Sequence, residues 1–168
     1  MAYNTIKLKK YLDIIEEKVA TAAITPGMLI ELTSTDTKVQ AHSTAGGNAI
    51  PIRVALESEL EGEDIDTAYA ADDRVQTWIP QRGAVAYMIL ADGENVSIAD
   101  PLESAGNGYL QKHVADVESF ESAEPGSISV YPNQIVGVAL EALDLSDSSG
   151  GESSGTLGYN KRIKVQFV

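Results

Sequence analysis

The chain lacks cysteine, has only two histidines and is poor in aromatic residues, and these shortages exclude several kinds of site. Without thiols there is no disulfide framework, no thiol nucleophile and no thiolate metal site. His42 and His113 are too isolated for a histidine metal centre, and we expect each to be a surface or edge residue. No H-E-x-x-H pair, P-loop or dinucleotide fingerprint occurs. We therefore expect no catalytic residue, metal or cofactor, and a protein that is not an enzyme.

Long apolar runs are also missing. None approaches the roughly 20 residues that cross a bilayer, and residues 1–10 lack the apolar core of a signal peptide. The net charge is −13, and residues 19–160 hold 5 basic against 22 acidic residues. A body with this charge repels phosphate backbones. We expect a protein made in a cytoplasm that binds neither nucleic acid nor membrane.

The 168 residues are enough for one main domain, and their apolar residues follow the alternation of short strands. Glycine and proline mark the turns between these strands. The sequence predicts a mainly β protein. Its expected strands lie at residues 28–32, 38–42, 50–56, 74–79, 85–89, 96–98, 109–114, 127–131, 134–143 and 162–168.

The clearest local pattern lies in residues 83–104. Apolar residues alternate over 85–89 and again over 96–98, on either side of Asp92-Gly93. An Asp-Gly pair suits the type I′ turn that joins two antiparallel strands. The pattern predicts a β-hairpin.

Residues 1–21 stand apart from the rest of the chain. Their apolar residues fit a strand period and a helical period equally, so the pattern leaves both open. A helix packed on its own domain is one interpretation. We favour an arm that is ordered only against another subunit or partner, because ordering costs roughly 1–2 kcal/mol per residue in backbone entropy.

The predicted division is therefore an arm at 1–21 and a β-rich domain at 22–168, with a flexible Gly/Ser loop at 146–155. Acidic residues near this loop, Asp144, Asp147 and Glu152, have oxygen ligands suited to calcium. Their spacing matches no EF-hand, so a solvated acidic loop is favoured.

Several strand and turn motifs follow one another in a recognisable order. The arm leads to ITPGMLIEL (24–32) and AIPIRVALE (49–57), then to GAVAYMILADGENVSIADPLES and GYLQK within 73–112, and then to IVGVALEAL (135–143) and a basic final strand. In this order, over most of residues 5–168 apart from the Gly/Ser loop, the chain resembles the head decoration, or capsid cement, proteins of tailed viruses of bacteria and archaea.

The resemblance implies a structural virion protein on the outer surface of an icosahedral capsid of the HK97 type. It would bind the major capsid protein as a homotrimer at three-fold and quasi-three-fold positions and stabilise the shell. The implied fold is a small β-barrel or sandwich, a β-tulip, with an extended N-terminal arm on the capsid. We expect the arm to supply the capsid-binding residues by strand addition or apolar contact. They are Ile6, Lys7, Leu8, Lys9, Lys10, Tyr11, Leu12, Ile14 and Ile15.

The alternative is a β-sandwich module that recognises a glycan or a host receptor. Exposed aromatic rings would stack on such a ligand, and the candidates are Trp78, Tyr69, Tyr109 and Tyr159. A single tryptophan in a strand-like stretch is, however, more often part of the core. A hydrolase with a carboxylate pair has no motif to support it.

Overall fold

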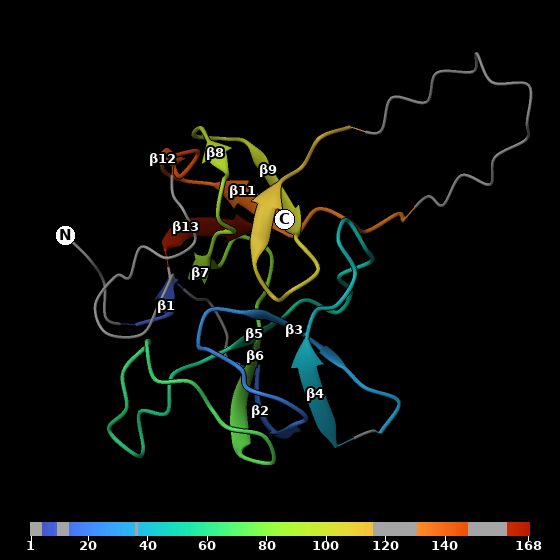
Figure 1. Ribbon diagram of the computed structural model, residues 1–168, viewed down its shortest axis with the longest axis vertical. Coiled ribbons are helices and arrows are strands. Elements are labelled where there is room, and N and C mark those ends of the chain that lie inside the picture. The colour runs from blue at the N-terminus through green and yellow to red at the C-terminus, as the bar shows by residue number, and fades with distance from the viewer. Residues whose placement is uncertain (1–4, 10–13, 36, 116–130, 148–160) are drawn as a thin grey trace, which may run out of the picture.

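The computed structural model describes residues 5–9, 14–35, 37–115, 131–147 and 161–168, which form thirteen strands and no helix (Figure 1). No helix among these residues is long and apolar enough to span a membrane. The mainly β fold class predicted from the sequence is confirmed. The strands are β1 (Lys7–Lys9), β2 (Ile14–Ala20), β3 (Leu29–Leu32), β4 (Lys38–Ala41), β5 (Arg53–Ala55), β6 (Arg74–Ile79), β7 (Val85–Ile89), β8 (Asn95–Val96), β9 (Pro101–Ser104), β10 (Leu110–Lys112), β11 (Gly137–Ala139), β12 (Leu143–Asp144) and β13 (Arg162–Phe167).

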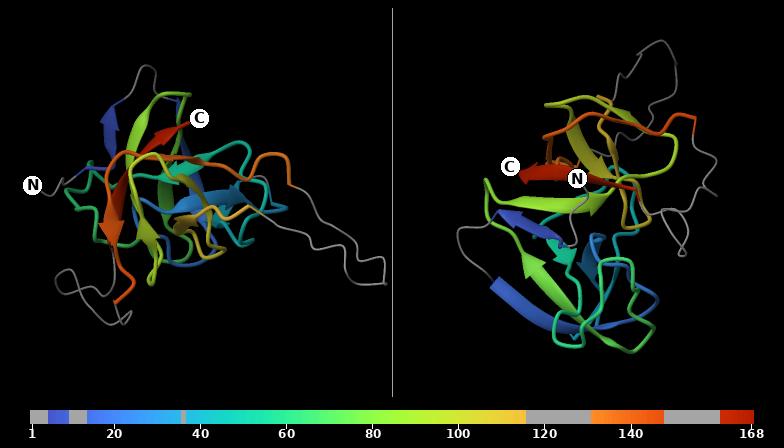
Figure 2. Two further views of the ribbon diagram at one scale, coloured as in Figure 1. Left: turned by 90° about the horizontal axis from the view of Figure 1, so that it is seen from above. Right: turned by 90° about the vertical axis from the view of Figure 1, so that its left-hand side faces the viewer.

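The strands form a closed barrel and a larger open sheet. The barrel has the order β2-β4-β3-β5-β6, in which the short β2–β4 pair is parallel and the other pairs are antiparallel. The six-stranded sheet has the order β1-β7-β13-β11-β9-β10 and is antiparallel throughout. In Figures 1 and 2 (right) this sheet lies above the barrel. A separate pair, β8 and β12, completes the fold.

Alternation along the barrel strands divides the apolar residues between two cores. One residue from each barrel strand, Ala20, Ile30, Val39, Ala55 and Val75, enters the core that fills the barrel. Their neighbours on the opposite face, including Leu29, Val54 and Trp78, join the larger core that is shared with the sheet. Side chains point to opposite faces in turn along a strand, so a single barrel strand serves both cores.

The N-terminal segment is part of this body, which corrects the expectation of a separate arm for its described residues. β1 pairs with β7 in the sheet, and β2 pairs with β6 over six residues to close the barrel. Ile6 is fully buried in the larger core. The carboxylate of Glu57, itself buried, accepts hydrogen bonds from Thr5 Oγ1 at 2.6 Å and from the Ile6 backbone N–H at 3.3 Å. The described residues of the segment, 5–9 and 14–21, therefore pack and pair within their own chain.

The predicted hairpin around Asp92-Gly93 is wrong, although the turn exists and Gly93 has φ of 84°. β8 pairs with β12 and not with β7. Both edges of β7 are already occupied, by β1 on one side and β13 on the other. No edge is left for the strand that follows the turn.

A buried arginine near the C-terminus forms hydrogen bonds with two loops. Arg162, at the start of β13, donates hydrogen bonds to the Asp66 carboxylate at 2.7 Å, to the Pro26 carbonyl at 3.1 Å and to the Ile65 carbonyl. Removing a buried charge from water is costly unless it is paired and hydrogen-bonded, as it is here. The acidic 57–66 stretch is thereby tied to the sheet at Ile65 and Asp66.

Candidate functional site

The predicted capsid-binding residues do not share one environment. Ile6 is buried and cannot contact a partner. Lys7 and Leu8 are partly exposed on β1, whereas Ile14 and Ile15 are 46% and 42% exposed at the start of β2. Lys9 is the last residue of β1. Lys10, Tyr11 and Leu12 lie outside the described residues.

Lys7, Leu8, Ile14 and Ile15 form what we call the N-terminal surface. β1 is an edge strand of the six-stranded sheet, so one side of its backbone faces no other strand of that sheet. Figure 2 (right) shows β1 and the start of β2 on the side of the molecule that faces the viewer. An edge strand that is followed closely in the sequence by exposed isoleucines is suited to strand addition and apolar contact. The N-terminal surface is therefore the part of the predicted site that remains accessible.

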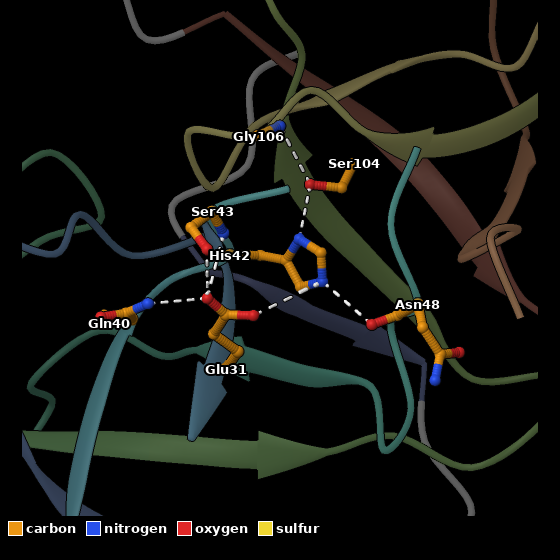
Figure 3. A network of polar contacts seen from close by, with 7 residues as sticks. All are labelled: Glu31, Gln40, His42, Ser43, Asn48, Ser104 and Gly106. Carbon is orange, nitrogen blue, oxygen red and sulfur yellow. Dashed lines mark hydrogen bonds and ion pairs between the residues drawn. The ribbon is translucent and has the colours of Figure 1, made fainter. Parts of the chain in front are cut away.

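A polar network that the sequence did not predict joins the barrel to the sheet (Figure 3). His42 follows β4 and is buried, so the surface position expected for it is wrong. Its Nε2 donates to the Asn48 carbonyl at 3.1 Å, which leaves Nδ1 to accept from the Ser104 hydroxyl at 2.8 Å. The Glu31 carboxylate lies 3.8 Å from Nε2.

Glu31 is held in place by its own donors. Its carboxylate accepts hydrogen bonds from Gln40 Nε2 at 2.7 Å and from the hydroxyl of Ser43 at 2.7 Å. Partial burial raises the pKa of Glu31, but these hydrogen bonds outweigh it, and the pKa is lowered overall. The carboxylate is therefore stabilised in its charged form.

The serine, histidine and glutamate of this network have the composition of a hydrolase triad but not its geometry. Ser104 is fully buried, and its Oγ also accepts from the Gly106 backbone N–H at 3.1 Å. A nucleophile must reach a substrate, and a general base must be free to take its proton. This network has the arrangement of a structural link between β3, β4 and β9. The one G-x-S-x-G string, at 151–155, lies outside the described residues.

The second histidine also has a carboxylate partner. His113 Nδ1 lies 2.5 Å from Oε2 of Glu103, which is buried on β9. Gln111 Nε2 donates to the other oxygen of Glu103 at 2.8 Å. These residues line a hollow of about 210 Å³ together with Gly46, Tyr131 and Gln134. Strand alternation gave no signal for this site, because its residues come from four separate parts of the chain.

The aromatic residues suggested for ligand stacking are mostly internal. Trp78 is fully buried, with its ring edge-to-face against Phe167 at a centroid distance of 5.8 Å. Tyr69 is also buried and donates a hydrogen bond to the Leu56 carbonyl at 2.9 Å. Tyr109 packs against the barrel core, and Tyr159 lies outside the described residues. Trp78 and Tyr69 are core residues and cannot stack on a ligand.

Acidic residues gather at several places without forming a metal site in the described part of the chain. The described residues hold no group of three or more potential ligands for a metal ion. Asp144 accepts hydrogen bonds from the backbone and the hydroxyl of Ser146 and so closes a local turn. A hollow of about 530 Å³ beside β6 is lined by carboxylates that include Glu17, Glu61 and Asp72. Such a surface disfavours contact with phosphate groups.

The fold defined above is a five-stranded barrel packed against an antiparallel sheet. No protein-family model and no curated protein matches the sequence. Among solved structures, the chain is similar to the N base of the head fiber gp8.5 of bacteriophage phi29. The similarity covers 94% of this chain and 95% of that chain, with a TM-score of 0.54 and 9% sequence identity. At this identity the comparison shows a shared fold.

Proposed function

We propose that this protein is a structural component of a virion that binds the outer surface of an HK97-type capsid and stabilises the shell. The observation that carries the proposal is the shared fold with a head-fiber base over nearly the whole of both chains. The order of strand and turn motifs, which resembles that of capsid decoration proteins, points the same way independently of the three-dimensional comparison.

The N-terminal surface is the proposed contact with the major capsid protein. The edge of β1 can add a capsid strand, and Ile14 and Ile15 can be covered by apolar capsid residues. Lys7 carries a positive charge on a chain whose net charge is −13 and would meet acidic capsid groups. The predicted contact by a loose arm is thus replaced by contact with strands that are already ordered, which lowers the entropy lost on binding.

A homotrimer at three-fold and quasi-three-fold positions would present three copies of this surface. Linked contacts raise the effective concentration of each further contact, so weak individual contacts sum to tight retention. Each trimer would hold several capsid subunits together. Nucleic acid and membrane are not proposed as partners.

The test uses the full chain with undecorated HK97-type shells, assembled from the major capsid protein encoded by the same genome. Light scattering of the free protein should give the mass of a trimer, and the protein should pellet with the shells. The variant is Ile14→Thr with Ile15→Thr, which keeps β-branching in β2 but removes apolar contact area. It should bind shells about tenfold more weakly or worse.

Matched substitutions at Leu60→Thr with Ile98→Thr provide the control, because these side chains are 87% and 66% exposed outside β1 and β2. The control variant should bind as the unaltered protein does. Equal binding by both variants would remove the N-terminal surface as the contact. A protein that is monomeric and does not pellet with the shells would overturn the proposed function itself.

A further inference from the structure

The hollow beside β9 and β10 has the chemistry of a ligand site that the proposed function does not use. It has a volume of about 210 Å³, and its lining residues include Gly46, Glu103, Gln111, His113, Tyr131 and Gln134. Drug-sized ligands occupy pockets of about 300–1,000 Å³, so this hollow suits one small ring.

Three polar groups of the hollow hold one another in place. The Glu103 side chain is 9% exposed and is held by His113 at 2.5 Å and by Gln111 at 2.8 Å. A carboxylate at Nδ1 of His113 fixes the proton on that nitrogen, so Nε2 of the neutral ring is a hydrogen-bond acceptor. The hollow therefore combines a carboxylate, an imidazole and an amide that are joined by hydrogen bonds, with the amide of Gln134 as a further polar group of the lining.

Apolar surface lies beside these polar groups. Tyr131 is 39% exposed and Val114 is 73% exposed at the same hollow. Gly46 has φ of 59°, and a Cβ there would lie 3.5 Å from Glu103 Oε1 and 3.8 Å from Gln134 Nε2. A methyl group at this position would lie in ordinary van der Waals contact with these two groups, so glycine leaves that part of the hollow to a ligand. A ligand can thus contact an aromatic side chain and the polar array together.

We propose that this hollow binds a single neutral sugar residue of a glycan. A pyranose offers adjacent hydroxyl groups, each able to donate and accept, and an apolar C–H face. Planar carboxylate and amide groups match the hydroxyls, and Tyr131 with Val114 matches the C–H face. The buried Glu103 carboxylate and the net charge of −13 oppose anionic sugars.

The position of the hollow separates sugar binding from capsid binding. β1 and β10 are the two opposite edges of the six-stranded sheet. A molecule attached to a capsid through β1 would leave the edge at β10, and the hollow with it, available for a glycan. The inference goes beyond the proposed function and does not depend on it.

The test is a titration of the isolated full-length protein with glucose, galactose, mannose and N-acetylglucosamine, followed by NMR. At least one of these sugars, at millimolar concentration, should shift the His113 ring signals and the side-chain amides of Gln111 and Gln134. Glucuronic acid, which is anionic, should bind about tenfold more weakly than the best neutral sugar. Failure of all four neutral sugars to shift these signals, or equal binding of glucuronic acid, overturns the proposal.

Two variants test whether the sugar binds in this hollow. Tyr131→Ala and Gln134→Ala should each weaken sugar binding about tenfold, whereas Leu60→Ala, at an exposed residue that does not line the hollow, should leave it unchanged. Emission from Trp78 checks that each variant is folded, because this single tryptophan is buried. Unchanged affinity in both hollow variants overturns the assignment. The affinity of these variants for capsid shells should stay unchanged. The sugar-binding proposal and the capsid-binding proposal can therefore fail separately.

Discussion

Glu31 is a charged residue of the polar network at the junction between barrel and sheet. It accepts hydrogen bonds from Gln40 and Ser43 and lies near His42. Its folded-state pKa lies below the ordinary value of 4.5. The charged form therefore stabilises the fold above that pH, and this contribution is lost as the pH falls through the folded-state pKa.

The substitution Glu31→Gln should consequently lower the free energy of unfolding by about 1–2 kcal/mol at pH 7, because it removes charge-assisted hydrogen bonds. The difference from the unaltered protein should shrink as the pH is lowered from 4.5 into the acid range, where Glu31 is itself protonated. Urea unfolding at several pH values measures both quantities.

Asp72→Asn is the matched control for Glu31→Gln. Asp72 pairs with Lys38 at 3.0 Å, but its side chain is 79% exposed. An exposed ion pair contributes about 0–1 kcal/mol, and asparagine tolerates the positive φ of this position. The control should change stability little. A loss in Glu31→Gln that is the same at every pH would mean that its charge has no part in the effect.

At the scale of elements, β1 is predicted to stabilise the body that it joins. Ile6, just before β1, is buried between sheet and barrel. Ile6→Ala should lower the free energy of unfolding by about 2–4 kcal/mol, because it leaves a cavity in a packed core. Denaturant unfolding followed by circular dichroism gives the value.

Ile14→Ala makes the same chemical change at a residue that is about half exposed on β2. Its expected loss is smaller than that of Ile6→Ala, because surface substitutions usually change stability by about 0.5 kcal/mol or less. An arm independent of the body would instead leave stability unchanged in Ile6→Ala. That result would restore the interpretation drawn from the sequence.

The strands that the sequence predicted well are those whose own residues alternate clearly. Residues 74–79 form β6 at the predicted limits, and the expected strands at 38–42 and 162–168 are one residue longer than β4 and β13. Pairing could not be predicted in the same way, because it depends on which edges remain free. The alternation at 96–98 was real, but β7 had no free edge to accept that segment.

The sites were harder to predict than the strands for a related reason. The apolar residues of 1–21 suggested a segment in need of a partner, and the partner of Ile6 is the core of its own chain. Glu103 and His113 are ten residues apart, and Gly46 and Gln134 come from distant loops. No local spacing connects them, so only the folded chain brings them together.

At the scale of the whole molecule, the barrel and the sheet meet at an aromatic contact inside the larger core. Trp78 belongs to β6 of the barrel, and Phe167 belongs to β13 of the sheet, next to the end of the chain. Both are buried in the larger core. Barrel and sheet should therefore unfold together, with tryptophan emission and circular dichroism giving one coincident transition.

Phe167→Ala tests this coupling, because it removes a sheet residue while the probe, Trp78, lies in the barrel. The free energy of unfolding should fall by about 3–5 kcal/mol, and both signals should shift to the same lower denaturant midpoint. Gln166→Ala, on the same strand with a partly exposed side chain, should shift them by far less. Circular dichroism of Phe167→Ala could instead show two transitions, only one of which is accompanied by a change in tryptophan emission. That result would mean that the barrel and the sheet unfold separately. The single transition is expected because each barrel strand that enters the larger core loses the packing on one of its two faces when the sheet is lost.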